Sequence, residues 1–237
     1  YTTYQSFAST IPALYDASVR ADIFSARTAK HKSALEAALF PDQVSVSVYD
    51  NLVASVRRHI PALARFVKRN GERIGVSDMR MIDLYVPAVE GFDIRLPFDE
   101  AYELVVEALS ALGEDYQEIL RTARRERWID VYPNRGKRGG AYSGGCYDSN
   151  PYILLNFSGT LDSVSTLAHE MGHTIHSWRS RQHQPPQYAD YTLFVAEVAS
   201  TVNENLLIEQ LLANESDPQT RLYLLNQYLE NFKGTVY

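Results

Sequence analysis

The chain contains the pattern H-E-x-x-H at residues 169–173, inside a segment with helical periodicity. Residues four apart on an α-helix lie on the same face one turn apart, so His169 and His173 can point at one ion. Imidazole nitrogens are common zinc ligands, and Glu170 beside them can take a proton from a zinc-bound water. The pattern therefore predicts a helix that carries a zinc site on one face.

The residues around this pattern favour a packed helix, because apolar side chains recur at nearly helical spacing. Gly172 costs about 1 kcal/mol in a helix relative to alanine, and the close approach of another backbone would explain it. Because H-E-x-x-H is short and also occurs by chance, a helix without a metal is the alternative. The apolar positions are Leu161, Val164, Leu167, Ala168, Met171 and Ile175.

A third ligand is expected, because a catalytic zinc usually has three protein ligands and one open position. Glu197, Thr201 and Glu204 form one polar line, at i, i+4 and i+7, on an otherwise apolar predicted helix. A buried carboxylate there is costly unless it is paired or binds a metal. We predict that Glu197 is the third ligand and that Glu204 orients a ligand histidine. The alternatives are Glu204 as the ligand, or a solvated helix face.

Two segments with extended character precede the metal helix. Residues 141–147 are glycine-rich but lack the Gly-Lys-Ser/Thr of a phosphate-binding loop, and residues 152–157 form the clearest strand of the chain. A strand beside the metal helix can accept an extended peptide by edge pairing, although a structural hairpin explains it equally well. We predict that Gly140, Ala141 and Tyr142 bind substrate.

Elsewhere the apolar spacing predicts mainly helices. Residues 81–87 are the exception and are predicted to be extended. The predicted helices cover 22–40, 45–70, 97–112, 114–127, 192–214 and 217–232.

Composition excludes several classes of function. The chain has 237 residues with 45% hydrophobic content, which suits one large domain or two small ones. Its net charge is −6 and it has no long basic block, so nucleic-acid binding is not expected. No apolar run approaches the ~20 residues of a membrane span, so we expect no membrane partner. The single Cys146 excludes an intrachain disulfide, and we predict a cytoplasmic location. The oligomeric state does not follow from the sequence.

Several longer motifs together resemble oligoendopeptidase F, a family of bacterial zinc metallopeptidases related to thimet oligopeptidase. The resemblance covers most of the chain from about residue 20, and the H-E-x-x-H pattern takes the longer form H-E-x-G-H-x-x-H. The matching segments are 33–40, 83–87, 136–143, 150–156, 169–176 and 194–200.

The resemblance implies a mainly α-helical zincin-type catalytic domain with a small β-sheet and a deep channel that admits peptides. It implies zinc bound by His169, His173 and Glu197, with Glu170 as the general base. His176 matches a further family histidine that is not a zinc ligand. We predict that it supports the residues of the site without binding the metal.

The resemblance also predicts that parts of the protein are missing from this sequence. We expect residues 1–237 to be one region of the catalytic domain, with a helical part at 1–128 and a strand hairpin plus zinc-binding helices at 129–237. Family members have a further C-terminal helical region whose His and Tyr stabilise the oxyanion, but no histidine follows His183 here. We expect the segment alone to be a poor enzyme, with Tyr188 or Tyr191 as a partial substitute.

The predicted function is zinc-dependent endopeptidase cleavage of short oligopeptides. Two alternatives stay open: a zinc carboxypeptidase, and a non-catalytic, metal-stabilised helical module that binds peptides.

Overall fold

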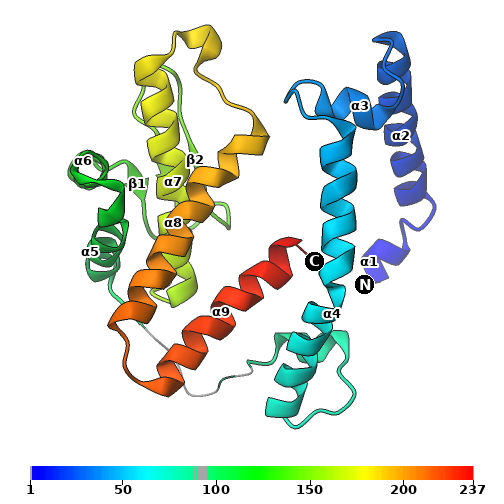
Figure 1. Cartoon of the computed structure of the whole chain (residues 1–237). Helices are drawn as coiled ribbons and strands as arrows, with labels where there is room; N and C mark the ends of the chain where they lie inside the picture. The colour runs from blue at the N-terminus through cyan, green and yellow to red at the C-terminus, as the bar shows by residue number, and fades with distance from the viewer. Residues whose placement is uncertain (1, 88, 90–94, 237) are drawn as a thin grey trace. The chain divides into compact units, whose positions relative to one another are not determined.

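The computed structural model describes residues 2–87, 89 and 95–236, and it consists of helices with one small sheet (Figure 1). The predicted fold class is therefore confirmed. The chain divides into two compact units, residues 1–60 and 61–237. The division falls within the long helix α4 (Val46–Arg73), at Pro61, where proline removes a backbone donor.

Helices are the regular elements of the first unit among its described residues, and turns connect them. It contains α1 (Thr2–Gln5), α2 (Thr10–Thr28), α3 (Ala34–Leu39) and the first part of α4. The single helix predicted over 22–40 is wrong, because the chain turns between α2 and α3. Lys30 adopts a left-handed backbone with a φ of 61°, which ends α2. The Ser33 side chain then accepts the backbone N–H of Glu36 at 3.0 Å and starts α3.

The second unit contains the remaining elements. Residues 81–85, predicted to be extended, form a 3₁₀ turn. The Asp83 carboxylate accepts the backbone N–H of Arg80 at 2.8 Å, so a local turn replaces the strand. In chain order the elements are η1 (Met81–Tyr85), α5 (Phe98–Ala108), η2 (Leu109–Leu112), α6 (Glu114–Arg125), β1 (Ile129–Asp130), β2 (Tyr142–Gly144), β3 (Tyr152–Leu154), α7 (Leu161–His183), η3 (Pro186–Tyr188), α8 (Leu193–Asn214) and α9 (Pro218–Val236).

The sheet has the order β1-β3-β2, so β3 is central and β2 lies at an edge. β3 runs parallel to β1 and antiparallel to β2, with Ile153 opposite Ile129 and Ser143. The predicted strand over 152–157 is confirmed at its start. Beyond Leu154 it continues as single hydrogen bonds, from Leu155 N–H to the Asp130 carbonyl and from Phe157 N–H to the Val131 carbonyl, both 2.9 Å.

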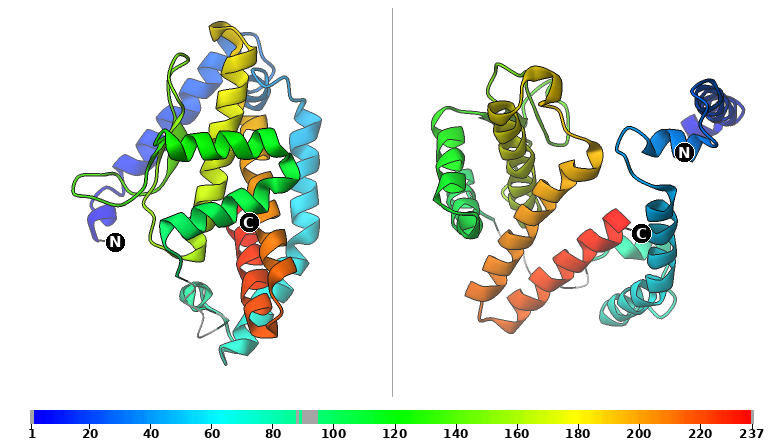
Figure 2. Two further views of the ribbon diagram at one scale, coloured as in Figure 1. Left: turned by 90° about the vertical axis from the view of Figure 1, so that its left-hand side faces the viewer. Right: turned by 45° about the horizontal axis from the view of Figure 1, so that its top comes forward.

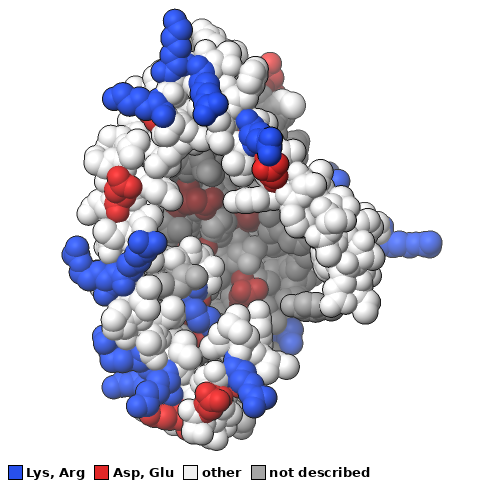
Figure 3. Space-filling view, turned by 90° about the vertical axis from the view of Figure 1, so that its right-hand side faces the viewer, with Lys and Arg blue, Asp and Glu red and all other residues white. Residues whose placement is uncertain are grey.

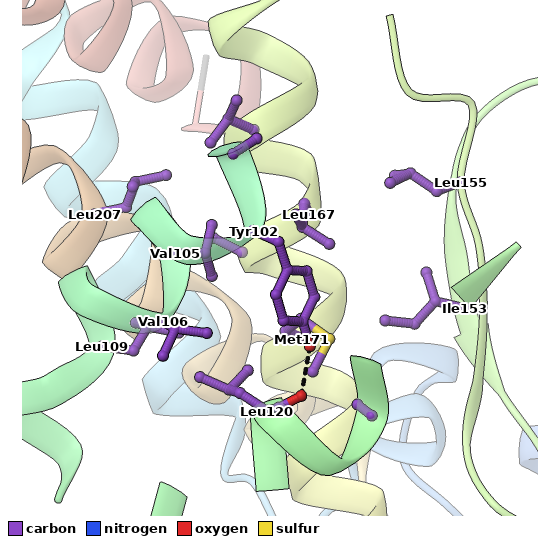
Figure 4. Packing of buried hydrophobic residues seen from close by; sticks show 14 of the residues in the cluster. Tyr102, Val105, Val106, Leu109, Leu120, Ile153, Leu155, Leu167, Met171 and Leu207 are labelled. Atoms are coloured by element: carbon purple, nitrogen blue, oxygen red, sulfur yellow. Dashed lines mark hydrogen bonds between the residues drawn. The ribbon is translucent and has the colours of Figure 1, made fainter. Parts of the chain in front are cut away.

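The core of this unit lies where α5, α6 and the sheet pack on α7 (Figures 2 and 4). Tyr102 is buried in it and donates its hydroxyl to the Leu120 carbonyl at 2.6 Å. Burial raises the pKa of Tyr102 well above its usual value, so the phenol stays neutral. Other fully buried members are Val105, Leu109, Trp128, Ile153, Leu155, Leu167, Met171 and Leu207.

Large apolar side chains are exposed on α8 and α9. These side chains lie in the first half of α8 and along one side of α9. They include Leu193, Phe194, Val198, Leu225, Leu229, Phe232 and Val236. Lys and Arg side chains are spread over the face shown in Figure 3, with Asp and Glu side chains among them. None of the helices in the described part of the chain is long and apolar enough to cross a membrane.

Candidate metal centre

The two helices that carry the candidate site, α7 and α8, lie in close contact at Gly172. A Cβ added to Gly172 would lie 2.7 Å from both the carbonyl oxygen of Ala199 and the Cα of Ser200. The predicted close approach of another backbone is therefore confirmed, and that backbone is α8. Thr160 caps the start of α7 by accepting the backbone N–H of Ser163 at 3.2 Å.

This contact brings three candidate ligands together. Nε2 of His169 lies 3.2 Å from Nε2 of His173. Oε2 of Glu197 lies 3.4 Å from the first nitrogen and 3.5 Å from the second. Ser200 donates its hydroxyl to the same Glu197 oxygen at 2.7 Å and so fixes that carboxylate.

The donor set fits a tetrahedral metal. Ligand atoms at zinc–ligand distances of 2.0–2.1 Å lie about 3.3–3.4 Å apart in a tetrahedron. The three measured separations, 3.2, 3.4 and 3.5 Å, fall around that value. Two imidazoles and one carboxylate are also a ligand set that leaves a fourth position open.

The side chain of Glu197 is 54% exposed rather than buried. The polar line of α8 borders a cavity rather than the packed core, and Glu197, Thr201 and Glu204 all line that cavity. A carboxylate in this position stays partly hydrated, so burial alone does not require a metal.

Glu204 contacts the second nitrogen of His169. Its Oε1 hydrogen-bonds Nδ1, which leaves Nε2 facing His173 and Glu197. This hydrogen bond raises the pKa of His169, partly opposed by burial. The backbone of Ala196 hydrogen-bonds the ring of His173, whose pKa is lowered chiefly by burial. Both rings are therefore held by α8.

Glu170 follows His169 on α7, and its carboxylate contacts the sheet. Its side chain is buried, with 6% of the residue exposed, and the backbone N–H of Ser143 on β2 hydrogen-bonds the carboxylate. Oε2 has no hydrogen-bond partner among the described residues. Burial, the largest effect, raises the pKa of Glu170, which makes this carboxylate a better proton acceptor.

His176 packs against Tyr191 rather than against the three candidate ligands. The two rings stack with centroids 3.6 Å apart and an interplanar angle of 13°. The Tyr191 hydroxyl hydrogen-bonds Ser177 Oγ at 2.8 Å and lies 3.5 Å from the carbonyl oxygen of His173. Tyr188, in contrast, is largely exposed.

The predicted substrate segment leads into the edge strand β2. The carbonyl of Gly140 accepts the Asn156 side chain at 2.8 Å, and Ala141 packs against the core. Tyr142 begins β2 opposite Leu154, and its side chain is exposed. The segment thus lies on the sheet whose Ser143 contacts Glu170.

Sequence reasoning missed two sets of polar contacts that hold α7 against α8 and against β2. Asn203, buried on α8, donates to the Ala168 carbonyl at 3.0 Å and accepts the Tyr116 hydroxyl at 2.9 Å. Ser143 and the buried Thr174 share a hydroxyl hydrogen bond of 2.7 Å. An asparagine among apolar residues of a helix was a usable signal for the first contact. The second joins residues that are 31 apart in sequence, and no local pattern reveals it.

Comparison with known proteins relates the chain to a family. The model of Peptidase family M3 matches residues 1–236. The chain belongs to peptidase family M3. Oligopeptidase PepF of Bacillus subtilis is 44% identical to this M3 chain over 237 residues, and oligoendopeptidase F (chromosomal) of Lactococcus lactis subsp. cremoris is 41% identical. The alignments cover 100% of the M3 chain but 35% and 39% of those relatives.

A solved structure shares the fold. The crystal structure of oligoendopeptidase-F from Enterococcus faecium superposes with a TM-score of 0.66 at 33% identity. It covers 100% of the M3 chain, which in turn covers 34% of that structure's chain.

Proposed function

We propose that this chain carries the metal-binding part of a zinc-dependent endopeptidase that hydrolyses short peptides. The supporting observation is the convergence of two imidazole nitrogens and one carboxylate oxygen, on His169, His173 and Glu197, within 4.8 Å of one another. The buried carboxylate of Glu170 beside them, and the names of the relatives, favour hydrolysis over metal binding alone.

Zinc, when bound, would lower the pKa of water and polarise the scissile carbonyl. Glu204 holds the His169 ring through Nδ1, so that Nε2 is free to bind a metal. Glu170 acts as the general base that takes a proton from the attacking water and passes it to the leaving amine. Its free Oε2 and its raised pKa suit both transfers.

The substrate lies along β2 in this proposal. β2 is an edge strand, so an extended peptide can add to it by main-chain hydrogen bonds. Gly140, Ala141 and Tyr142 would contact that peptide. His176 supports the backbone near His173 through its stacking on Tyr191.

We also propose that residues 1–237 form part of a helical catalytic domain, with the zinc-binding helices in 129–237. A cytoplasmic location accords with the single cysteine, Cys146, which is exposed and free.

The test is Glu170→Gln. Glutamine is nearly isosteric and cannot accept the proton, so zinc content should stay unchanged while cleavage of an internally quenched peptide falls by about 10²–10⁴. Product lengths from the wild-type protein separate internal from terminal cleavage. Activity of Glu170→Gln within a few-fold of wild type, at equal zinc content, would show that the base lies elsewhere.

A further inference from the structure

The loop that leads into β2, the proposed substrate strand, is built around two glycines. Residues 131–141 connect β1 to β2 without a helix or strand of their own. Gly136 and Gly140 have left-handed backbones, with φ of 87° and 85°, so the chain changes direction at both. A Cβ added at either glycine would meet no atom of the described residues within 4 Å, so packing does not hold the loop there. Such a segment keeps one conformation when side chains hold it.

Lys137 provides the first hold on this loop. Its side chain is 3% exposed, and Nζ donates to the carbonyl oxygens of Asp130 at 2.9 Å and Tyr132 at 2.8 Å. The Asp130 carboxylate lies 3.2 Å from the same nitrogen. An ammonium has three N–H donors, so each has an acceptor within the protein. Lys137 therefore ties the middle of the loop to the end of β1, and it has no donor left for a peptide.

Asn156 provides the second hold, at the point where the β2–β3 ladder stops. Tyr142 pairs with Leu154 in the antiparallel register, so continuing that register by two residues places Asn156 opposite Gly140. There the Asn156 side chain takes over from the main chain, because Nδ2 donates to the carbonyl oxygens of Gly140 and Arg138, both at 2.8 Å. Both N–H donors of the amide are used in this way. The residues that precede β2 are thus held by the chain that continues β3.

We propose that Lys137 and Asn156 are positioning residues, which hold residues 138–142 in the conformation that an extended peptide substrate joins. This inference rests on the proposed function, in which the peptide adds to β2. Neither residue donates to the peptide, because the donors of both are already used within the protein. A preformed loop spares the peptide the cost of ordering that loop when it binds.

The expected consequence of losing a hold is weaker substrate binding with little loss of turnover. Only a fraction of the molecules would then have the competent loop, and the apparent dissociation constant rises by the inverse of that fraction. Ser143 keeps its place opposite Ile153 in the ladder, so its backbone contact with Glu170 should persist. Once the peptide is bound, the site should therefore react as in the wild type.

The test measures KM and kcat for an internally quenched extended peptide in the zinc-loaded, full-length protein. Lys137→Met keeps the aliphatic stem and loses the ammonium. A hydrogen bond to a charged group is worth about 10–100-fold in an equilibrium constant, so KM should rise by that factor while kcat stays within about two-fold. Asn156→Asp keeps the shape of the side chain but places an acceptor against two carbonyl oxygens, so it should change KM in the same direction.

Two matched controls separate the hold on the loop from a change of charge. Arg135→Met removes a positive charge from an exposed residue of the same loop. Asp130→Asn removes only the charge of a carboxylate that is 64% exposed, and both carbonyl acceptors of Lys137 remain. Both controls should keep the wild-type KM.

Amide hydrogen exchange shows whether the loop itself is released. Exchange at residues 136–142 should be faster in Lys137→Met and Asn156→Asp than in the wild type, and unchanged in Arg135→Met. Exchange in α5 and α6 should be the same in all four proteins. Faster exchange in these helices would identify a variant that is damaged throughout, and if Lys137→Met is of that kind, Asn156→Asp decides.

Binding to the Glu170→Gln protein tests the inference without turnover. Calorimetry with the extended peptide should show an affinity about 10–100-fold lower when Lys137→Met is added. If the wild type cleaves no peptide but this loss and the faster exchange are seen, the proposed catalysis fails and the positioning role stands. If both variants release the loop while KM and affinity keep their wild-type values, the positioning role is overturned and the proposed function stands. Unchanged exchange of the loop in both variants would overturn the positioning role as well.

Discussion

Gly172→Ala should weaken metal binding although residue 172 binds no metal. The added Cβ would lie 2.7 Å from the Ala199 oxygen and the Ser200 Cα, both backbone atoms of α8. Backbone atoms of a packed helix cannot rotate away as a flexible side chain can. The two helices must therefore separate, and Glu197 moves with α8.

The size of the effect follows from this overlap. Restoring an ordinary contact requires α8 to move by about 0.7 Å, whereas metal–ligand distances tolerate only about 0.2 Å. Overpacking of this kind costs about 2–3 kcal/mol, offset by about 1 kcal/mol from the better helix propensity of alanine. The net loss of about 1–2 kcal/mol should lower Tm by about 2–8 °C. Zinc affinity should fall by about 10–100-fold.

Two measurements check this: thermal unfolding of the metal-free protein, and zinc affinity by competition with a chelator. Gly234→Ala is the matched control. It also replaces a helical glycine, on α9, and its Cβ would meet no atom within 4 Å, so it should be neutral or slightly stabilising. If Gly172→Ala matched Gly234→Ala in both Tm and zinc affinity, the close contact would not hold the ligands together.

Three further predictions concern the site and its supports. Glu197→Ala should lose zinc by elemental analysis, whereas Glu204→Ala should keep it with about 10–100-fold weaker affinity; full zinc retention in Glu197→Ala would refute the ligand assignment. Thr174→Val removes the hydroxyl that hydrogen-bonds Ser143 on β2. It should lower kcat by about 2–10-fold and shift the pH profile of kcat/KM, and Thr174→Ser should restore both. An unchanged profile would show that this hydrogen bond does not help to hold Glu170. Tyr116→Phe should cost about 1–3 kcal/mol in urea unfolding at pH 8. Burial raises the pKa of Tyr116 to about 12. The wild-type protein therefore loses stability as pH rises from about 10 toward 12, and its difference in unfolding free energy from Tyr116→Phe should shrink over that range. A constant difference would contradict this.

Local patterns predicted most helices correctly. The helices expected over 114–127, 192–214 and 217–232 appear as α6, α8 and α9 with boundaries shifted by up to four residues. Where these predictions failed, a short-range feature of the chain determined the local structure. The left-handed backbone of Lys30 divides the predicted 22–40 helix, and the Asp83 carboxylate folds a predicted strand into a turn. Apolar spacing does not encode either contact.

The sequence by itself determined which side chains can share one face of a helix. His169 and His173 are one turn apart, and helix geometry alone places them together. The sequence also indicated that another backbone approaches Gly172. Glycine is unfavourable in a helix, and nothing else in the segment needs one.

Only the tertiary structure decided which carboxylate faces which nitrogen. Glu197 and Glu204 share one face of α8, and their spacing does not distinguish their positions. The contact at Gly172 sets the height of α8 against α7, which puts Glu197 beside both Nε2 atoms and Glu204 against Nδ1 of His169. The contacts of Asn203 and Ser143 likewise join elements that are distant in sequence. Such pairings depend on the packing of whole elements, which local periodicity does not specify.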